Sequence, residues 1–314
     1  MFAVKCLIMI RTALTGSEKF LRHYMEIIMD HPEFIITGVH LHNHKTDSHS
    51  GSFSIEAYSI PYEKLHETSD ALIVTDKAGE CFDLISRFLK KSRHVLILPD
   101  LTLSCPQLKK LTKIADEAGV ILNLHHKTLN GVIKQKIREY IFRPEYIFLK
   151  SQITAKPARE NFTIFSALYR YIYLIVELNP VNPVKYYVTG IPVCSTEPRI
   201  LDVNIQFENG TSAHLNISSC FKEEYEKLEI FGHDRMITID PSKNEFLIIQ
   251  SHPDEIKNKS LSYACRQNNE DVLTKFYKSI TGRNGSENRI SSGIVAHQLA
   301  SGILHQIHPA PVED

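Results

Sequence analysis

The stretch Ile10–Gly16, which reads IRTALTG, holds residue types that could meet a bound anion. If it follows the first strand of a parallel sheet, it lies where a dinucleotide fold brings its backbone close to phosphate at a helix N-terminus. That approach needs glycines, and this loop has one, at its end. Side-chain donors could replace the backbone, and the alternative is a loop that no longer binds phosphate. The residues predicted to contact a cofactor here are Arg11, Thr12, Ala13 and Leu14.

Histidines follow two further predicted strands. His40, His42 and His44 alternate where the second strand ends, at the place where an acidic residue usually holds the adenosine ribose. Alternation in a loop fixes no geometry and no carboxylate orients the rings, so we predict no metal site. His42 remains a candidate cofactor contact. His126, directly after the fifth strand, could act as an acid, a base or a hydrogen-bond donor, and the alternative is a structural role.

A third group of chemically capable residues lies on an apolar helix predicted over 162–178. Arg170 stands there among three tyrosines, and its guanidinium could bind a carboxylate or a phosphate through paired hydrogen bonds. It cannot act as a general base, because the pKa of arginine lies above ~12. The alternative is that the tyrosines pack on a sheet and Arg170 forms a structural ion pair. His126 and Arg170 are therefore candidate catalytic residues of the chain.

The elements that position these residues alternate between strand and helix in the first part of the chain. Short apolar runs rich in β-branched residues predict buried strands at 4–10, 34–41, 71–75, 95–98 and 120–124. Helical apolar spacing separates them at 17–29, 80–91 and 106–118. This alternation predicts right-handed crossovers and a Rossmann-type parallel sheet. At the carboxyl ends of its third and fourth strands, Thr75 and Pro99 are further predicted cofactor contacts.

The second part of the chain changes to longer β-patterned segments, predicted at 146–153, 184–191, 200–207, 212–219, 227–231, 236–239 and 246–249. We predict that they form a large, mostly antiparallel open sheet in an α+β domain. The fold class is therefore α/β, with two domains. Residues 1–126 form a dinucleotide-binding-like domain, and residues 127–314 form a sheet domain for substrate binding and dimerisation that includes closing helices within 269–307.

The composition of the chain limits the kinds of partner that it can bind. The chain has 36 Lys and Arg and 36 Asp and Glu, so no overall charge attracts nucleic acid or an anionic membrane. No apolar run approaches the ~20 residues of a membrane span, and no secretion signal is evident, so we expect a cytoplasmic protein. The six cysteines form no C-x-x-C pair, which favours reduced, buried thiols. We predict a small-molecule ligand and a homodimer or tetramer through an apolar sheet face formed by Ile200, Val203, Ile205, Leu215 and Ile217.

Over nearly its whole length the chain resembles the Gfo/Idh/MocA oxidoreductases. The resemblance is carried by DALIVT at 70–75, a helix, and RHVLILPDLTLSCPQLKKLTKIADEAGVILNLHH at 93–126. The segments 269–280 and 289–307 resemble the closing helix pair of that family. The resemblance implies a Rossmann-type domain, an NAD or NADP cofactor, and a sugar or another small hydroxy or carbonyl compound as substrate.

The same resemblance shows which functional residues are replaced. The glycine fingerprint of the family falls on Ile10, Thr12 and Thr15, and its Glu-Lys-Pro falls on the Leu-Pro-Asp at 98–100. The helix motif that carries its catalytic histidine falls on Ser166, Arg170 and Tyr173, with Arg170 in the histidine position, so the resemblance implies Tyr173 as a further candidate catalytic residue. The helix over 162–178 contains no His, Lys or Asp at all. We therefore predict a divergent NAD(P)-dependent oxidoreductase-like protein. The alternative is a catalytically inactive relative that acts as a subunit or as a ligand-binding, regulatory protein.

Overall fold

A computed structural model describes residues 8–42, 58–98, 102–125, 129, 131–154, 164–193, 198–252, 255–262, 269–282 and 290–307 of the chain. The chain divides into two compact units: unit 1 comprises residues 1–126 with 268–294, and unit 2 comprises 127–267 with 295–314. The boundary after residue 126 coincides with the predicted one. The helix that begins at Asn269 differs from the prediction, because it belongs to unit 1 and not to the sheet domain.

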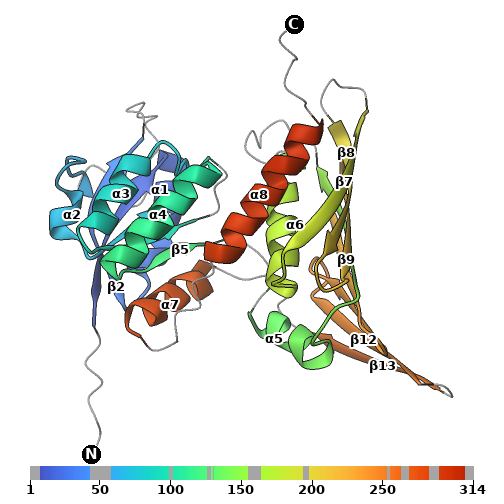
Figure 1. The fold of residues 1–314 in the computed structure, drawn as a ribbon. Helices are drawn as coiled ribbons and strands as arrows, with labels where there is room; N and C mark the ends of the chain where they lie inside the picture. The colour runs from blue at the N-terminus through green and yellow to red at the C-terminus, as the bar shows by residue number, and fades with distance from the viewer. Residues whose placement is uncertain are drawn as a thin grey trace, which may run out of the picture. The chain divides into compact units, whose positions relative to one another are not determined.

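Unit 1 is built on a five-stranded parallel sheet in the order β2-β1-β3-β4-β5 (Figure 1). Its strands are β1 (Ile10–Gly16), β2 (Phe34–Leu41), β3 (Ala71–Val74), β4 (His94–Ile97) and β5 (Leu122–Leu124). Its helices are α1 (Glu18–Met29), α2 (Leu65–Thr68), α3 (Phe82–Lys90), α4 (Cys105–Ala118) and α7 (Asn269–Ile280). The predicted Rossmann-type parallel sheet is thus confirmed. Its strand order reverses between β1 and β3, the place where such folds bind ligands.

Two apolar layers cover this sheet. Ala13, Leu72 and Val95 pack with α3 and α4, whereas their chain neighbours on the same strands pack with α1 and α7. Alternate residues of a strand point to opposite faces, so a strand covered by helices on both sides is apolar throughout. The ring of Phe276 on α7 stacks 6.4 Å from that of Phe34 on β2, which explains why α7 belongs to unit 1.

The first strand does not lie where the sequence predicted it. We predicted a strand at 4–10 followed by a loop, whereas β1 runs over Ile10–Gly16 and residues 1–7 lie outside the described residues. Thr12 and Thr15 are fully buried in β1. The Thr12 hydroxyl donates a hydrogen bond to the carbonyl oxygen of Ile10 at 3.1 Å, which satisfies it inside the core. The stretch interpreted as a phosphate loop is therefore a central strand.

Unit 2 holds an eight-stranded sheet in the order β13-β12-β11-β10-β6-β9-β8-β7. Its strands are β6 (Tyr146–Thr154), β7 (Pro183–Pro192), β8 (Pro198–Phe207), β9 (Ser212–Phe221), β10 (Tyr225–Phe231), β11 (Arg235–Asp240), β12 (Glu245–His252) and β13 (Glu255–Ser262). All neighbouring strands are antiparallel except β6 and β9. The prediction of a large, mostly antiparallel sheet is confirmed.

Helices α5 (Gly131–Tyr140), α6 (Ile164–Leu178) and α8 (Ile290–Ile307) lie on one side of this sheet (Figure 1). Helix α6 contacts β6, β8 and β9. Val203, Ile205, Leu215 and Ile217 are fully buried and Ile200 is partly buried, so most of the predicted apolar row is covered within the chain. The predicted homodimer or tetramer stays a prediction. The other face of β8 and β9 carries Asp202, whose carboxylate accepts a hydrogen bond from His214 Nε2 at 2.8 Å. A partner meeting that face would meet polar side chains.

Candidate functional site

A carboxylate lies at the switch point of the parallel sheet, at the N-terminus of α1. Asp76 follows β3, and its Oδ1 accepts a hydrogen bond from the backbone N–H of Ser17 at 2.7 Å. The Ser17 hydroxyl donates to Oδ2 of the same carboxylate, also at 2.7 Å. Ser17 is the N-cap of α1, and a helix N-terminus stabilises an anion through its free N–H groups and its dipole. The place that a ligand phosphate takes in this kind of fold is thus held by an anion of the chain itself.

The turn between β1 and α1 also has no open space around its glycine. A Cβ atom built on Gly16 would collide with the Thr75 hydroxyl and with the Asp76 carboxylate. Thr75 is 3% exposed, and its hydroxyl donates to the carbonyl oxygen of Thr15 at 3.2 Å. The predicted cofactor contact Thr75 therefore lies at the expected edge, but the chain itself buries and occupies its polar atoms. Gly16 serves close packing of β1 against the end of β3.

The predicted contact His42 also lies at this edge, directly after β2. Its Nε2 is 2.9 Å from the Thr15 hydroxyl and 2.8 Å from the thiol sulfur of Cys81. Cys81 is the N-cap of α3 and is 2% exposed. His42 therefore meets a hydroxyl and a thiol of the protein where the adenosine ribose was expected.

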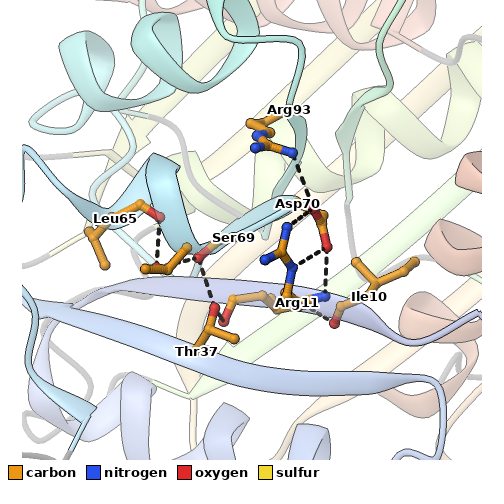
Figure 2. Close-up of polar contacts among 9 residues, drawn as sticks. Ile10, Arg11, Thr37, Leu65, Ser69, Asp70 and Arg93 are labelled. Atoms are coloured by element: carbon orange, nitrogen blue, oxygen red, sulfur yellow. Dashed lines mark hydrogen bonds and ion pairs between the residues drawn. The ribbon is translucent and has the colours of Figure 1, made fainter.

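Arg11 lies at the opposite side of the same sheet, near the amino ends of its strands (Figure 2). Its guanidinium forms two hydrogen bonds with the Asp70 carboxylate, from Nε at 2.9 Å and from Nη2 at 2.7 Å. Arg93 donates to the same carboxylate at 3.1 Å. These three residues stand at the amino ends of β1, β3 and β4, whereas ligands of such folds bind at the carboxyl ends. The prediction that Arg11 contacts a cofactor is therefore wrong, because β1 begins later than predicted.

The ion pair at the amino edge has a structural function. The side-chain hydrogen bonds from Arg11 lower the pKa of Asp70, and burial opposes them. The same contacts raise the pKa of Arg11. The backbone N–H of Asp70 also donates to the carbonyl oxygen of Arg11 at 2.7 Å, so the pair fixes β1 against the start of β3.

The other predicted site residues of unit 1 either lie inside β1 or fall outside the described residues. Thr12, Ala13 and Leu14 lie inside β1 with no exposed surface, so the prediction that they contact a cofactor is wrong for the same reason. His126 and Pro99 lie outside the described residues. Within the described ranges, no three His, Cys, Asp or Glu side chains cluster in a way that could hold a metal ion. No helix among those ranges is long and apolar enough to cross a membrane.

Unit 2 contains a pocket of about 330 Å³ beside α6. Arg170 and Tyr171 line it from α6, and strands β6 and β10 and the turn after β11 supply Ser151, Gln152, Ile153, Glu224, Tyr225, Glu226, Pro241 and Ser242. Arg170 Nη2 is 3.4 Å from Glu226 Oε2, so the ion pair considered as the alternative role of Arg170 is present. Two glutamates against one arginine leave the lining with an excess of negative charge. Hydroxyl and amide groups supply the remaining polar atoms.

Tyr171 is the centre of the polar network in this pocket. Its hydroxyl lies 2.7 Å from the Ser151 hydroxyl, donates to Glu226 at 3.2 Å and accepts a hydrogen bond from Arg170. Burial raises the pKa of Tyr171 to about 12, so the phenol stays protonated and acts as a donor near neutral pH. Tyr173, which we predicted as catalytic, is 3% exposed and does not line the pocket. The sequence analysis named Tyr173 as the candidate, whereas Tyr171 is the tyrosine of α6 that lines the pocket.

Solved structures of oxidoreductases match the fold of this chain. UDP-N-acetylglucosamine 3-dehydrogenase from Acidithiobacillus ferrooxidans gives a TM-score of 0.77 at 18% identity, over 94% of this chain and 97% of that one. Biliverdin reductase from Synechocystis, in complex with biliverdin and NADP+, gives 0.70 at 14% identity, over 94% and 98%. A Gfo/Idh/MocA family oxidoreductase from Vibrio cholerae gives 0.70 at 14%, over 95% and 98%. This chain has the Gfo/Idh/MocA oxidoreductase fold.

Neither a protein-family profile nor a curated protein matches the sequence. In this oxidoreductase fold, the described residues of unit 1 do not fit a dinucleotide in the arrangement that they adopt. A diphosphate at the N-terminus of α1 would have to displace the Asp76 carboxylate from Ser17. Among the described residues, His42 is the one that follows β2, at the place where an acidic side chain would hold a ribose.

Proposed function

We propose that the protein is a divergent oxidoreductase of the Gfo/Idh/MocA type, with a sugar or another small hydroxy or carbonyl compound as its substrate. The observation that carries this proposal is the fold. Both units are retained, and the match with a sugar-nucleotide dehydrogenase extends over 94% of the chain. Fold likeness at such low identity gives only an analogy, so the site has to support it.

The pocket of unit 2 supports the substrate class. The polar side chains of its lining are those of Ser151, Gln152, Arg170, Tyr171, Glu224, Tyr225, Glu226 and Ser242, which suit a ligand that both donates and accepts hydrogen bonds. The lining has more acidic than basic groups, and Glu226 neutralises Arg170. An uncharged hydroxy or carbonyl compound therefore fits this lining better than a carboxylate or a phosphate does.

The cofactor of the proposed reaction is NAD or NADP, and it binds only if Asp76 leaves Ser17. Displacement is chemically plausible because a phosphate offers the same kind of oxygen acceptor to the same two donors. A nucleotide would therefore replace the internal hydrogen bonds instead of leaving the N-terminus of α1 without an acceptor.

The contact between Ser17 and Asp76 also favours a second candidate function. If the carboxylate is permanent, the protein is a catalytically inactive relative that binds its ligand in unit 2 and acts as a subunit or a regulator. In that case the N-terminus of α1 needs no nucleotide, since its donors are satisfied within unit 1.

Titration with NADH and with NADPH separates the two candidates. The melting temperature of the full chain is followed up to millimolar nucleotide, because a ligand at 100 times its Kd stabilises a protein by about 2.7 kcal/mol. A rise with either nucleotide supports the oxidoreductase. The absence of any rise, in the wild type and in Asp76→Ala alike, rejects the oxidoreductase and leaves the inactive relative.

A further inference from the structure

Three side chains that could support covalent chemistry meet at the carboxyl edge of unit 1. The sulfur of Cys81, at the start of α3, lies 2.8 Å from Nε2 of His42. The same nitrogen is 2.9 Å from the Thr15 hydroxyl, which itself lies 3.7 Å from the sulfur. Cys81 is 2% exposed, whereas His42 is partly exposed. The thiol therefore lies inside unit 1, beside an imidazole that reaches the surface.

This geometry matches what an activated thiol requires. A nucleophile needs a base within hydrogen-bond distance. Here His42 Nε2 is the base for Cys81, and the Thr15 hydroxyl is a second hydrogen-bond partner of the same ring nitrogen. Cys81 is also the N-cap of α3, and the positive end of a helix dipole favours a thiolate at that position. Both effects stabilise a thiolate.

We propose that Cys81, His42 and Thr15 form a reactive-thiol site that takes soft carbon electrophiles of the α,β-unsaturated carbonyl class. His42 Nε2 holds the thiol proton, and the thiolate forms a bond from its sulfur to the β-carbon of the electrophile. The π electrons of the carbon–carbon double bond move to the α-carbon and carbonyl, and that enolate takes the proton from His42. The addition is redox-neutral and needs no further reactant. It is independent of the proposed oxidoreductase function.

The charged and titratable groups around the pair act in both directions. Strand β2 supplies His40, whose ring lies 5.9 Å from that of His42. Tyr62 faces Cys81, and its pKa is raised first by burial and then by the charges of Cys81 and Asp83, with Arg87 opposing. On the chain before α3, Glu80 pairs with Lys77 at 3.4 Å. The acidic groups and burial oppose a thiolate, whereas the imidazole and the helix N-terminus favour it.

Labelling of the full chain with N-ethylmaleimide, itself an α,β-unsaturated carbonyl compound, tests the proposal. The rate at each cysteine is measured by peptide mass mapping between pH 6 and pH 7, with the exposed Cys220 as the internal reference. An ordinary thiol, with a pKa of about 8.5, reacts about tenfold faster at pH 7 than at pH 6. We expect the rate at Cys81 to change less than about twofold over this range, because its thiolate is already formed.

His42→Asn removes the base and should restore the tenfold rise at Cys81. His40→Asn is the matched control, since it removes the neighbouring histidine of β2, whose ring lies 5.9 Å from that of His42, and it should leave the flat profile unchanged. A tenfold rise at Cys81 in the wild type, or no labelling of Cys81 in the native protein, would overturn the proposal. If His42→Asn fails to fold, the wild-type profile alone decides.

Discussion

Replacing Asp76 by alanine removes the internal anion from the N-terminus of α1. The structure gives this carboxylate two hydrogen bonds of 2.7 Å, both from Ser17. A hydrogen bond to a charged group is worth about 1.5–3 kcal/mol, but water takes over part of it at this partly buried site. Loss of an N-terminal acceptor costs about 1 kcal/mol and loss of a negative charge there costs about 0.3–1 kcal/mol. We therefore expect the free energy of unfolding to fall by about 2 kcal/mol.

That loss should appear as a melting temperature lower by about 4–8 °C, since a domain of this size shifts by about 2–4 °C per kcal/mol. The free energy that Asp76→Ala loses in folding should appear as a gain in its affinity for a nucleotide. A nucleotide that binds the wild type has to break the bonds between Ser17 and Asp76, and a nucleotide that binds Asp76→Ala does not. Removing a cost of about 2 kcal/mol strengthens binding by about 30-fold. Isothermal titration of both proteins with NADH and NADPH measures the ratio.

Asp70→Ala is the matched control, because it removes a carboxylate that lies directly before β3, at the end of the strand opposite to Asp76. It should lower the melting temperature and leave nucleotide affinity unchanged. The reasoning is refuted if Asp76→Ala melts at the wild-type temperature, since the carboxylate would then contribute nothing at α1. If Asp76→Ala loses stability and still binds no nucleotide, the N-terminus of α1 is not a phosphate site and the oxidoreductase proposal fails with it.

Three further changes test the reasoning elsewhere in the chain. Gly16→Ala should destabilise unit 1 by about 1–3 kcal/mol in urea unfolding, because the added methyl collides with Thr75. Lys134→Met should cost about 3–5 kcal/mol in the same assay, since it leaves Glu177 charged and buried, and the Lys134→Met/Glu177→Leu double variant should recover most of it. Asp70→Asn should lower the melting temperature at pH 7. Because folding lowers the pKa of Asp70 below 3.8, this difference should shrink as the pH falls through and below that value.

The large-scale fold was predictable because its signals are local. Each parallel strand after the first is a short apolar run, and the β-patterned segments of unit 2 are long enough for their alternation to be clear. The short helix α2, the helix α5 and the edge strand β13 were not predicted. Strand β13 reads EIKNKSLS, which is polar, and its pairing with β12 gives it its structure more than its own sequence does.

The first strand was misplaced for a physical reason. The apolar run at 4–10 gives the stronger hydrophobic signal, whereas β1 contains Arg11, Thr12 and Thr15. Threonine is β-branched and can return its hydroxyl to the backbone, as Thr12 does to Ile10, so it tolerates a buried strand. The sequence Gly16-Ser17-Glu18 carried the better signal, since a serine before a helix marks an N-cap. One misplaced strand moved four predicted cofactor contacts away from the ligand edge.

The functional contacts that the sequence missed are long-range. Asp76 meets Ser17 across 59 residues, and Cys81 meets His42 across 39. Tyr171 and Glu226, on α6 and β10, are 55 residues apart. The strand order of unit 1 brings the first two pairs together, and the error of six residues in β1 hides the contact of Ser17 with Asp76. His42 and Arg170 lie outside β1, and both were predicted as candidate site residues. His42 lies beside Thr15 at the carboxyl ends of the parallel strands, and Arg170 lines the pocket of unit 2.

Two carboxylates flank β3, and each fixes it to a residue of β1 or directly after it. Asp70 pairs with Arg11 before the strand, and Asp76 accepts hydrogen bonds from Ser17 after it. Strand β3 has only four residues, Ala71–Val74, so it makes few ladder hydrogen bonds of its own and gains from contacts at both ends. Asp76 is therefore part of how unit 1 holds together without a ligand. A phosphate could take over that contribution because it would accept hydrogen bonds from the same two donors. Whether the Asp76 carboxylate can leave Ser17 therefore decides whether a cofactor can bind at the carboxyl ends of these strands.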